Sequence, residues 1–267
     1  MATSLLQGKK GLITGITNKR SIAYGIAKTL SEHGAELAIT YQNEMVRERL
    51  SSVAVELNVE LVLNCDVANE ETIDEVFKIT EKKWGSLDFL VHAIAFSDKN
   101  ELGGKYVNTS LSNFLNAMHI SCYSFTALAQ RAEKIMPNGG SLLTLSYYGA
   151  EKVMPNYNVM GLCKAALEAS VRYIACDLGP QNIRVNAISA GPIRTLASSG
   201  ISNFHFISEW NRNNSPLRRN TTIEDVGKAA LYLLSDLSSG TTGEVLHVDS
   251  GYNVVGMKAI DSNIVQS

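Results

Sequence analysis

The chain has 267 residues, 45% hydrophobic and 19% charged, and its 24 basic and 26 acidic residues give a net charge of −2. This balance provides no general attraction to nucleic acid or anionic lipid, and so few charges suit a large core. No apolar stretch can span a bilayer, and the first ten residues lack a signal-peptide pattern, so we expect no membrane partner and a soluble, cytoplasmic protein.

Short apolar runs alternate with longer helical patterns along the whole chain. The predicted strands are 11–15, 36–40, 60–65, 87–94, 141–145, 184–188 and 244–248. The predicted helices are 21–33, 43–57, 70–84, 111–136, 157–178 and 223–235. Nearly continuous apolar strands between helices indicate a parallel sheet covered on both faces. We therefore predict one α/β domain over residues 1–267, a doubly wound Rossmann-type sheet of about seven parallel strands.

The turn after the first strand is a candidate dinucleotide site. Gly15 fits the tight turn, Ser21 stands where a later glycine is common, and Gly25 lies within the next helix. A strand that leads through a short turn into a helix presents backbone N–H groups to a pyrophosphate. Ser21 could also donate its hydroxyl and cap the helix. The glycine pattern is only partial, so a capped helix without a ligand remains an alternative.

The ends of the next three strands carry candidate contacts to the rest of a dinucleotide. Gln42 follows the second strand, where a side chain meets the adenosine ribose. It offers no charge to a 2′-phosphate, which favours NADH over NADPH, although a surface glutamine is the alternative. Asp66 ends the third strand and could accept from an adenine amino group or cap the following helix. Small residues after the fourth strand leave room for a cofactor, and we interpret His92 as a core histidine.

The four cysteines and five histidines show no spacing typical of a metal site. The cysteines are far apart in apolar or helical contexts, which favours small buried side chains over a disulfide framework. No histidine stands at metal-ligand spacing from another or from a cysteine. We therefore expect no metal.

A tyrosine and a lysine at helical spacing are the candidate catalytic pair. Tyr157 and Lys164 are seven residues apart, so on one helix their side chains share a face. A phenol beside a fixed ammonium favours hydrogen bonding to a developing oxyanion. The alternative is a surface tyrosine and a lysine whose stem covers apolar surface.

Taken in order, these motifs resemble those of a known family. The segments that carry the likeness are 21–27, 40–43, 142–147, 155–161 and 184–197. The chain resembles the short-chain dehydrogenases/reductases and, within them, the bacterial NADH-dependent enoyl-acyl-carrier-protein reductases of type II fatty-acid synthesis. The likeness extends from Gly8 to about Met257.

The resemblance implies that the trans-2 double bond of an enoyl thioester on acyl carrier protein is reduced with NADH. Hydride adds at C3 of the acyl group, and negative charge appears on the thioester oxygen. Tyr157 would donate a hydrogen bond to that oxygen, and Lys164 would hold the nicotinamide ribose. Tyr147 matches the family's second active-site tyrosine and would shape the acyl pocket, and Ser97 would also lie at the substrate.

The resemblance also implies cofactor contacts along the chain. Gly15, Ser21 and Ile22 would contact the pyrophosphate side, Gln42 the ribose, Asp66 and Val67 the adenine, Ile94 the nicotinamide ribose, and Ile193, Thr195, Leu196 and Ala197 the cofactor after the sixth strand.

A segment rich in aromatic residues follows, and we expect it to form a mobile lid near 196–216. Its large apolar residues are Phe204, Phe206, Ile207 and Trp210. A lid must bury hydrocarbon yet open for product release; the alternative is a helical hairpin that completes the core. Relatives often carry basic residues here that meet the acidic carrier protein, whereas this chain has Ser202 and His205, so we expect shifted or weaker docking. The family also implies a homotetramer.

Two other functions remain open. A 3-ketoacyl or alcohol reductase of the same superfamily would use a Tyr-x-x-x-Lys pair, and Tyr148 with Lys152 has that spacing. This pair lies in the loop before Pro155, without a continuous helix, so we interpret it as a decoy. A nucleotide-sensing module without turnover is the third possibility, but it leaves the Tyr157 and Lys164 pair without a purpose.

Overall fold

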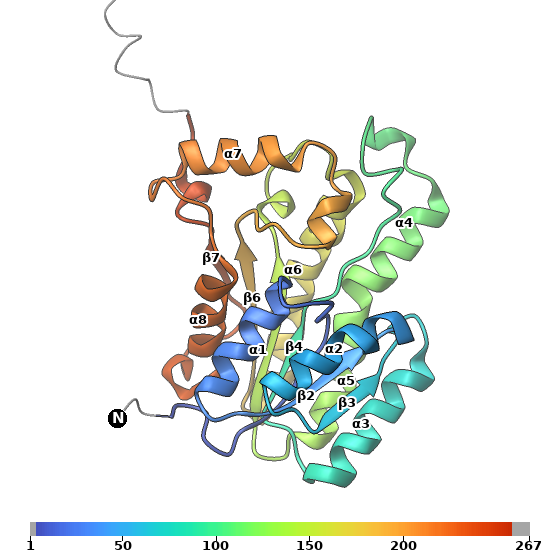
Figure 1. Ribbon diagram of the computed structural model, residues 1–267, viewed down its shortest axis with the longest axis vertical. Coiled ribbons are helices and arrows are strands. Elements are labelled where there is room, and N and C mark those ends of the chain that lie inside the picture. The colour runs from blue at the N-terminus through green and yellow to red at the C-terminus, as the bar shows by residue number, and fades with distance from the viewer. Residues whose placement is uncertain (1–3, 258–267) are drawn as a thin grey trace, which may run out of the picture.

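Seven parallel strands form one sheet in the computed structural model, which describes residues 4–257 (Figure 1). The strands are β1 (Lys10–Ile13), β2 (Glu36–Tyr41), β3 (Leu61–Asn64), β4 (Phe89–His92), β5 (Gly140–Ser146), β6 (Ile183–Ala190) and β7 (Val245–Val248). Their order is β3-β2-β1-β4-β5-β6-β7, so the winding reverses between β1 and β4. The predicted doubly wound α/β fold is confirmed.

Eight α-helices are described around this sheet. They are α1 (Ile22–Glu32), α2 (Glu44–Glu56), α3 (Glu70–Trp84), α4 (Leu111–Met118), α5 (Ser124–Ala132), α6 (Asn158–Leu178), α7 (Phe204–Asn214) and α8 (Ile223–Leu234). Helix α1 approaches α8 closely at Gly25, where a Cβ atom would stand 2.6 Å from the carbonyl oxygen of Ile223. Gly25 therefore serves helix packing.

Each strand contributes side chains to two hydrophobic cores, because successive side chains point to opposite faces of a sheet. In β1, Leu12 packs in one buried cluster with Phe125 of α5 and Val171 of α6. Its neighbour Ile13 packs in a second cluster with Ile26 of α1. The helices thus cover both faces, and only the ends of the strands remain available for a site.

The predicted helix 111–136 is interrupted. A π-helical turn over His119–Tyr123 separates α4 from α5, and a 3₁₀ turn over Glu133–Ile135 ends the segment. Within the π turn, the Ser121 hydroxyl donates to the carbonyl oxygen of Phe96 and accepts from its amide. The distortion therefore attaches this helical segment to the chain that leaves β4.

His92 is a core histidine, as predicted. It is fully buried, and its two ring nitrogens each lie 2.8 Å from a hydroxyl, that of Thr144 and that of Ser124. Burial, together with the charge of Lys164, lowers the pKa of His92 to about 3. The ring is therefore neutral at ordinary pH.

The four cysteines are free thiols, and Cys65, Cys122 and Cys163 are buried as expected. The prediction is wrong for Cys176, which is exposed. Cys176 lies on the outer face of α6 with Arg172 and Tyr173, a face that the sheet does not cover. In residues 4–257, no group of three or more His, Cys, Asp or Glu side chains could hold a metal ion. No helix in that range is both long and apolar enough to cross a membrane.

Candidate active site

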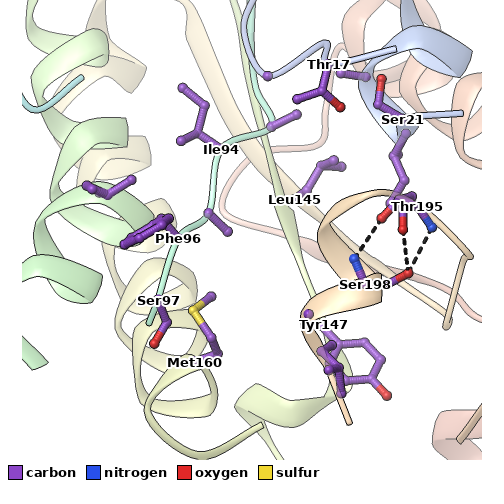
Figure 2. A pocket seen from close by; sticks show the side chains of 18 of the residues that line it. Thr17, Ser21, Ile94, Phe96, Ser97, Leu145, Tyr147, Met160, Thr195 and Ser198 are labelled. Carbon is purple, nitrogen blue, oxygen red and sulfur yellow. Dashed lines mark hydrogen bonds between the residues drawn. The ribbon is translucent and has the colours of Figure 1, made fainter. Parts of the chain in front are cut away.

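A cavity of about 720 Å³ opens at the carboxyl ends of the strands (Figure 2). Its lining comes from segments that follow six different strands, which is where open α/β sheets bind ligands. Figure 2 shows Ile94, Phe96, Ser97 and Met160 on one side of this cavity and Thr195 and Ser198 on the other. Among the predicted site residues, those that line it are Gly15, Ser21, Ile22, Gln42, Asp66, Val67, Ile94, Ser97, Tyr147, Tyr157, Lys164, Ile193 and Thr195.

The turn after β1 has the geometry expected of a phosphate-binding turn. Gly15 has a φ of +86°, and a Cβ atom there would lie 2.0 Å from the carbonyl oxygen of Ala93. Only glycine satisfies both constraints. Ser21 is the N-cap residue of α1, but its hydroxyl donates to the Asn18 carbonyl oxygen at 2.7 Å. The expected side-chain cap is therefore wrong, and Ser21 stabilises the turn.

Gln42 and Asp66, which follow β2 and β3, both line the cavity. Asn69 caps α3, because its side chain accepts from the amide of Glu71 at 3.0 Å. Asn69, and not Asp66, is therefore the residue that caps α3. The Asp66 carboxylate accepts from the Ala68 amide at 3.1 Å and faces the cavity. Gln42 is exposed at the cavity rim.

Tyr157 and Lys164 come together in the cavity. Helix α6 begins at Asn158, one residue later than predicted, and Tyr157 is its N-cap. The backbone is not regular helix at this point, since Tyr157 has φ −111° and Asn158 has φ +32°, but Tyr157 and Lys164 both line the cavity. Both side chains are buried. The Tyr147 ring meets that of Tyr157 edge-on, with centroids 5.0 Å apart.

Burial sets the protonation states of this group. It raises the pKa values of Tyr157 and Tyr147 well above those of a free phenol, so both hydroxyls stay protonated. Burial lowers the pKa of Lys164 to about 8. The ammonium donates to the carbonyl oxygen of Leu145 at 2.7 Å, and this fixes it beside the end of β5. At neutral pH the site therefore offers a neutral phenol and a positive charge.

A second link between α6 and β5 lies one helical turn further on. The Ser146 hydroxyl donates to the carboxylate of Glu168, and both residues are buried. Burial raises the pKa of Glu168, which the bond from Ser146 opposes. The sequence interpretation did not include Glu168; its spacing of four from Lys164 is the signal that could have found it.

The competing pair lies elsewhere. Tyr148 sits in a 3₁₀ turn, donates to the Asn253 carbonyl oxygen at 3.3 Å, and packs against Tyr252. Lys152 is exposed. Neither residue is among those that line the cavity.

The segment after β6 only partly matches the expected contacts. Ile193 and Thr195 line the cavity, whereas Leu196 is 46% exposed and is not among the described lining residues. The side chain of Ala197 lies outside the described part of the structure. Ser198, not included in the sequence interpretation, is buried and exchanges hydrogen bonds of 2.8 Å and 3.1 Å with Thr195. Two hydroxyl side chains three residues apart, which can each bond a nearby backbone amide, were the available signal.

The expected lid residues divide into two pairs. Phe204 and Ile207 line the cavity. Phe206 and Trp210 are exposed and pack on each other, and the Trp210 indole donates to the Tyr252 hydroxyl at 3.0 Å. In Figure 1, α7 lies beyond the tip of β6, at the end of the sheet where the cavity opens.

Several apolar lining residues gave no sequence signal. They are Phe96, Leu102, Met154, Met160 and Ile201. These residues come from four separate segments, so only the fold gathers them. Ser97, on the same side, is held by Asn113, whose side-chain oxygen accepts from its hydroxyl at 3.3 Å.

Comparison with known proteins identifies the family of the chain. The family model described as enoyl-(acyl carrier protein) reductase matches residues 15–253. A curated enoyl-[acyl-carrier-protein] reductase [NADH] of Rhizobium meliloti is 62% identical over 261 residues, 98% of this chain and 96% of the relative. Its counterpart in Escherichia coli is 49% identical, covering 96% of this chain and 98% of the relative.

Solved structures give the same result. The reductase of Anaplasma phagocytophilum, in complex with NAD, superposes with a TM-score of 0.93 at 66% identity, over 96% of this chain and 98% of that one. The Bacillus cereus reductase, with NADP+ and an indole naphthyridinone, has a TM-score of 0.93 at 48% identity, over 95% and 99%. The predicted family is confirmed: this chain belongs to the enoyl-acyl-carrier-protein reductases of the short-chain dehydrogenase/reductase superfamily.

Proposed function

We propose that this protein reduces the trans-2 double bond of enoyl thioesters on acyl carrier protein, using NADH, in type II fatty-acid elongation. The observation that carries the proposal is that Tyr157 and Lys164 line the same cavity as the turn after β1. A phenol and an ammonium thus lie within reach of a bound dinucleotide. The names of the curated relatives support NADH as the cofactor.

The residues present fit a dinucleotide. Gly15 keeps the turn open against β4, and the first turn of α1 contains no acidic residue that would repel a pyrophosphate. Gln42 would bond the adenosine ribose, and Asp66 with Val67 would border the adenine. Ile94, Ile193 and Thr195 would border the nicotinamide half. When bound, NADH supplies the hydride.

Tyr157 would donate a hydrogen bond to the thioester oxygen as negative charge develops there. The bond strengthens as charge grows, so it stabilises the transition state more than the ground state. The raised pKa of Tyr157 keeps the proton on the phenol for this task. Lys164 would bind the nicotinamide ribose and contribute positive charge. Tyr147, edge-on to Tyr157, would shape the acyl pocket with Ser97.

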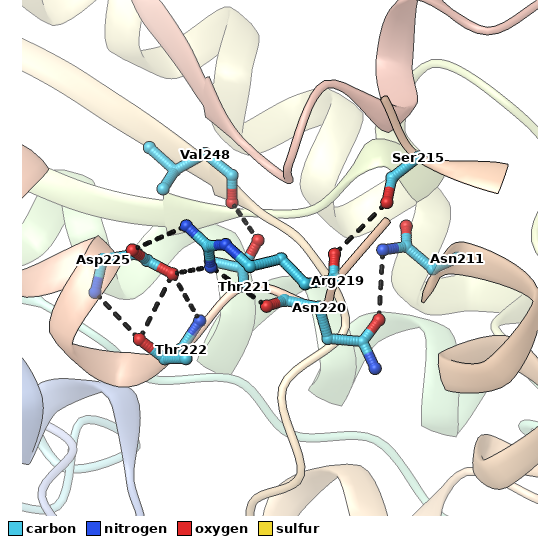
Figure 3. Close-up of polar contacts among 8 residues, drawn as sticks. All are labelled: Asn211, Ser215, Arg219, Asn220, Thr221, Thr222, Asp225 and Val248. Carbon is cyan, nitrogen blue, oxygen red and sulfur yellow. Dashed lines mark hydrogen bonds and ion pairs between the residues drawn. The ribbon is translucent and has the colours of Figure 1, made fainter. Parts of the chain in front are cut away.

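The segment 196–216 would act as the lid. Phe204 and Ile207 would cover the acyl chain from α7, in keeping with their place in the cavity wall. This part of the chain would also receive the carrier protein, and here its basic residues matter (Figure 3). Figure 3 shows Arg219 paired with Asp225. Arg212 is paired with Glu209.

These ion pairs neutralise part of the positive charge that an acidic carrier protein would meet near the lid. Arg218 donates to the Asn213 carbonyl oxygen at 2.5 Å, so it too has a local partner, although its charge is not paired with an acid there. Shifted or weaker carrier docking follows from this arrangement.

A homotetramer in the cytoplasm completes the proposal. Large apolar side chains are exposed along the helices α4 to α6, at positions suited to a subunit contact: Leu111, Leu115, Tyr123, Leu162 and Tyr173. Free thiols at all four cysteines suit a reducing compartment. Light scattering of the purified protein would measure the assembly.

The decisive experiment follows nucleotide oxidation with crotonyl and acetoacetyl thioesters, each with NADH and with NADPH. We expect consumption of NADH with the crotonyl thioester. Preference for the acetoacetyl thioester would make the protein a ketoacyl reductase. Nucleotide binding without turnover of either would indicate a sensing module.

A further inference from the structure

Two asparagines with left-handed backbone conformations flank Tyr157. Asn156 has a φ of +57° and Asn158 a φ of +32°. Among residues with a side chain, asparagine adopts such angles at the lowest cost. The two side-chain amides point to different neighbours, which suggests a role beyond backbone shape.

The Asn156 amide holds the chain that precedes α7. It donates to the carbonyl oxygen of Ser202 at 2.8 Å. The neighbouring residue Ile201 lines the cavity. Asn156 therefore connects the residue before Tyr157 to the lid side of the cavity wall.

The Asn158 amide holds a second segment of the cavity wall. It donates to the carbonyl oxygens of Glu101 and Gly103, each at 3.1 Å. The residue between these two carbonyls is Leu102, which lines the cavity. The loop is also attached to α4, because the Glu101 carboxylate accepts from the amide and the hydroxyl of Ser110, each at 2.8 Å.

Leu102, Ile201 and Tyr157 belong to one apolar cluster. Leu102 and Tyr157 are buried in it with Met160, and Ile201 packs against it. The two walls and the phenol therefore share packing as well as the hydrogen bonds of the flanking asparagines. A displacement of either wall would be transmitted to Tyr157.

We propose that Asn156 and Asn158 are positioning residues that couple the seating of the acyl chain to the placement of the Tyr157 hydroxyl. An acyl chain long enough to lie between Leu102 and Ile201 would restrain both segments of the cavity wall. The side-chain amides of Asn156 and Asn158 would then restrain the position of the Tyr157 phenol. A short chain would use the coupling less. The expected effect on kinetics rests on the proposed function. The attachment of the two wall segments by Asn156 and Asn158, here called the clamp, does not.

Glycine substitutions isolate the amides, because glycine keeps the left-handed backbone and removes only the side chain. In Asn156→Gly, we expect backbone amide hydrogens of 198–204 to exchange about two- to tenfold faster, with 101–105 unchanged, since one neutral hydrogen bond is lost. Asn158→Gly should give the reverse pattern. Asn58→Gly is the matched control, since Asn58 has a φ of +50° and lies exposed at the end of α2. Unchanged hydrogen exchange in both Asn156→Gly and Asn158→Gly would show that the two side-chain amides do not hold the cavity wall.

Kinetics test the coupling. In Asn156→Gly, we expect kcat/KM for a dodecenoyl thioester to fall about three- to tenfold more than for a crotonyl thioester, with the Kd of NADH unchanged. Equal losses for the two substrates would contradict the coupling. If the unmodified protein reduces neither thioester, the proposed function fails, and the exchange measurement still decides whether the clamp exists.

Discussion

The ammonium of Lys164 donates a 2.7 Å hydrogen bond to the carbonyl oxygen of Leu145, two residues before Tyr147. This bond ties helix α6 to the end of β5, directly before Tyr147. The Ser146–Glu168 pair repeats the link one helical turn later. Helix α6 cannot shift along β5 without breaking both.

Removal of the Tyr157 hydroxyl tests the oxyanion role. In Tyr157→Phe, we expect turnover to fall by about 10²–10³, the usual effect of losing one oxyanion donor, with NADH affinity retained. Steady-state kinetics and a fluorescence titration with NADH would measure the two. Tyr148→Phe is the control, because Tyr148 is not among the cavity-lining residues, and its turnover should not change. Full activity in Tyr157→Phe would refute the assignment.

The pH dependence should report Lys164. Burial lowers its pKa to about 8, compared with about 10.4 in an unfolded chain. We therefore expect kcat/KM to decline above about pH 8 as the ammonium loses its proton. Circular dichroism across the same range would check that the fold persists.

The effect of Lys164 on stability has the opposite sign. Between about pH 8 and about pH 10, the unfolded chain binds more protons than the folded chain, so this residue's contribution to stability rises with pH. Below about pH 8, the free-energy cost of burying Lys164 as a cation is fully present. A decline in activity that coincides with unfolding would contradict the interpretation.

Loss of the second link should weaken the fold. Ser146→Ala leaves the buried Glu168 carboxylate without this donor, and we expect a loss of about 1–3 kcal/mol in the free energy of unfolding. Chemical denaturation would measure it. Ser51→Ala, an exposed serine on α2, should change stability by less than about 0.5 kcal/mol. Equal effects in the two variants would mean that the bond contributes little.

Cofactor choice should depend on Gln42. Two cations in the neighbouring segments have acidic partners: Arg47 pairs with Glu44 and Lys19 with Glu56. An added guanidinium in Gln42→Arg should favour NADPH relative to NADH by about ten- to a hundredfold, through charge-assisted bonds to the 2′-phosphate. The ratio of kcat/KM for the two cofactors measures this. Gln42→Met, which adds no charge, should not raise the use of NADPH.

Gly15 and Gly8 form a matched pair for backbone strain. Both have positive φ, but a Cβ atom at Gly8 meets nothing within 4 Å, whereas at Gly15 it would collide with the Ala93 carbonyl. Gly8→Ala should cost about 1 kcal/mol of stability. Gly15→Ala should cost several times more and abolish NADH binding, because β1 and β4 must separate. Similar stability of the two variants, measured by denaturation, would exclude this explanation.

The sequence by itself determined the parallel sheet, the turn after β1 and the spacing of Tyr157 and Lys164 at the start of one helix. These features follow from periodicity and spacing, which are local properties of the chain. The family followed from motifs spread along the sequence, and the comparisons confirm it.

Only the tertiary structure decided which apolar side chains of the segment after β6 face the cavity. Leu196, Phe206 and Trp210 are apolar like Phe204 and Ile207, yet only the last two are described in the cavity wall. It also selected the Leu145 carbonyl as the partner of Lys164. A period relates the side chains within one helix, but contacts between distant segments decide which face of that helix meets the cavity, and these form only when the chain folds.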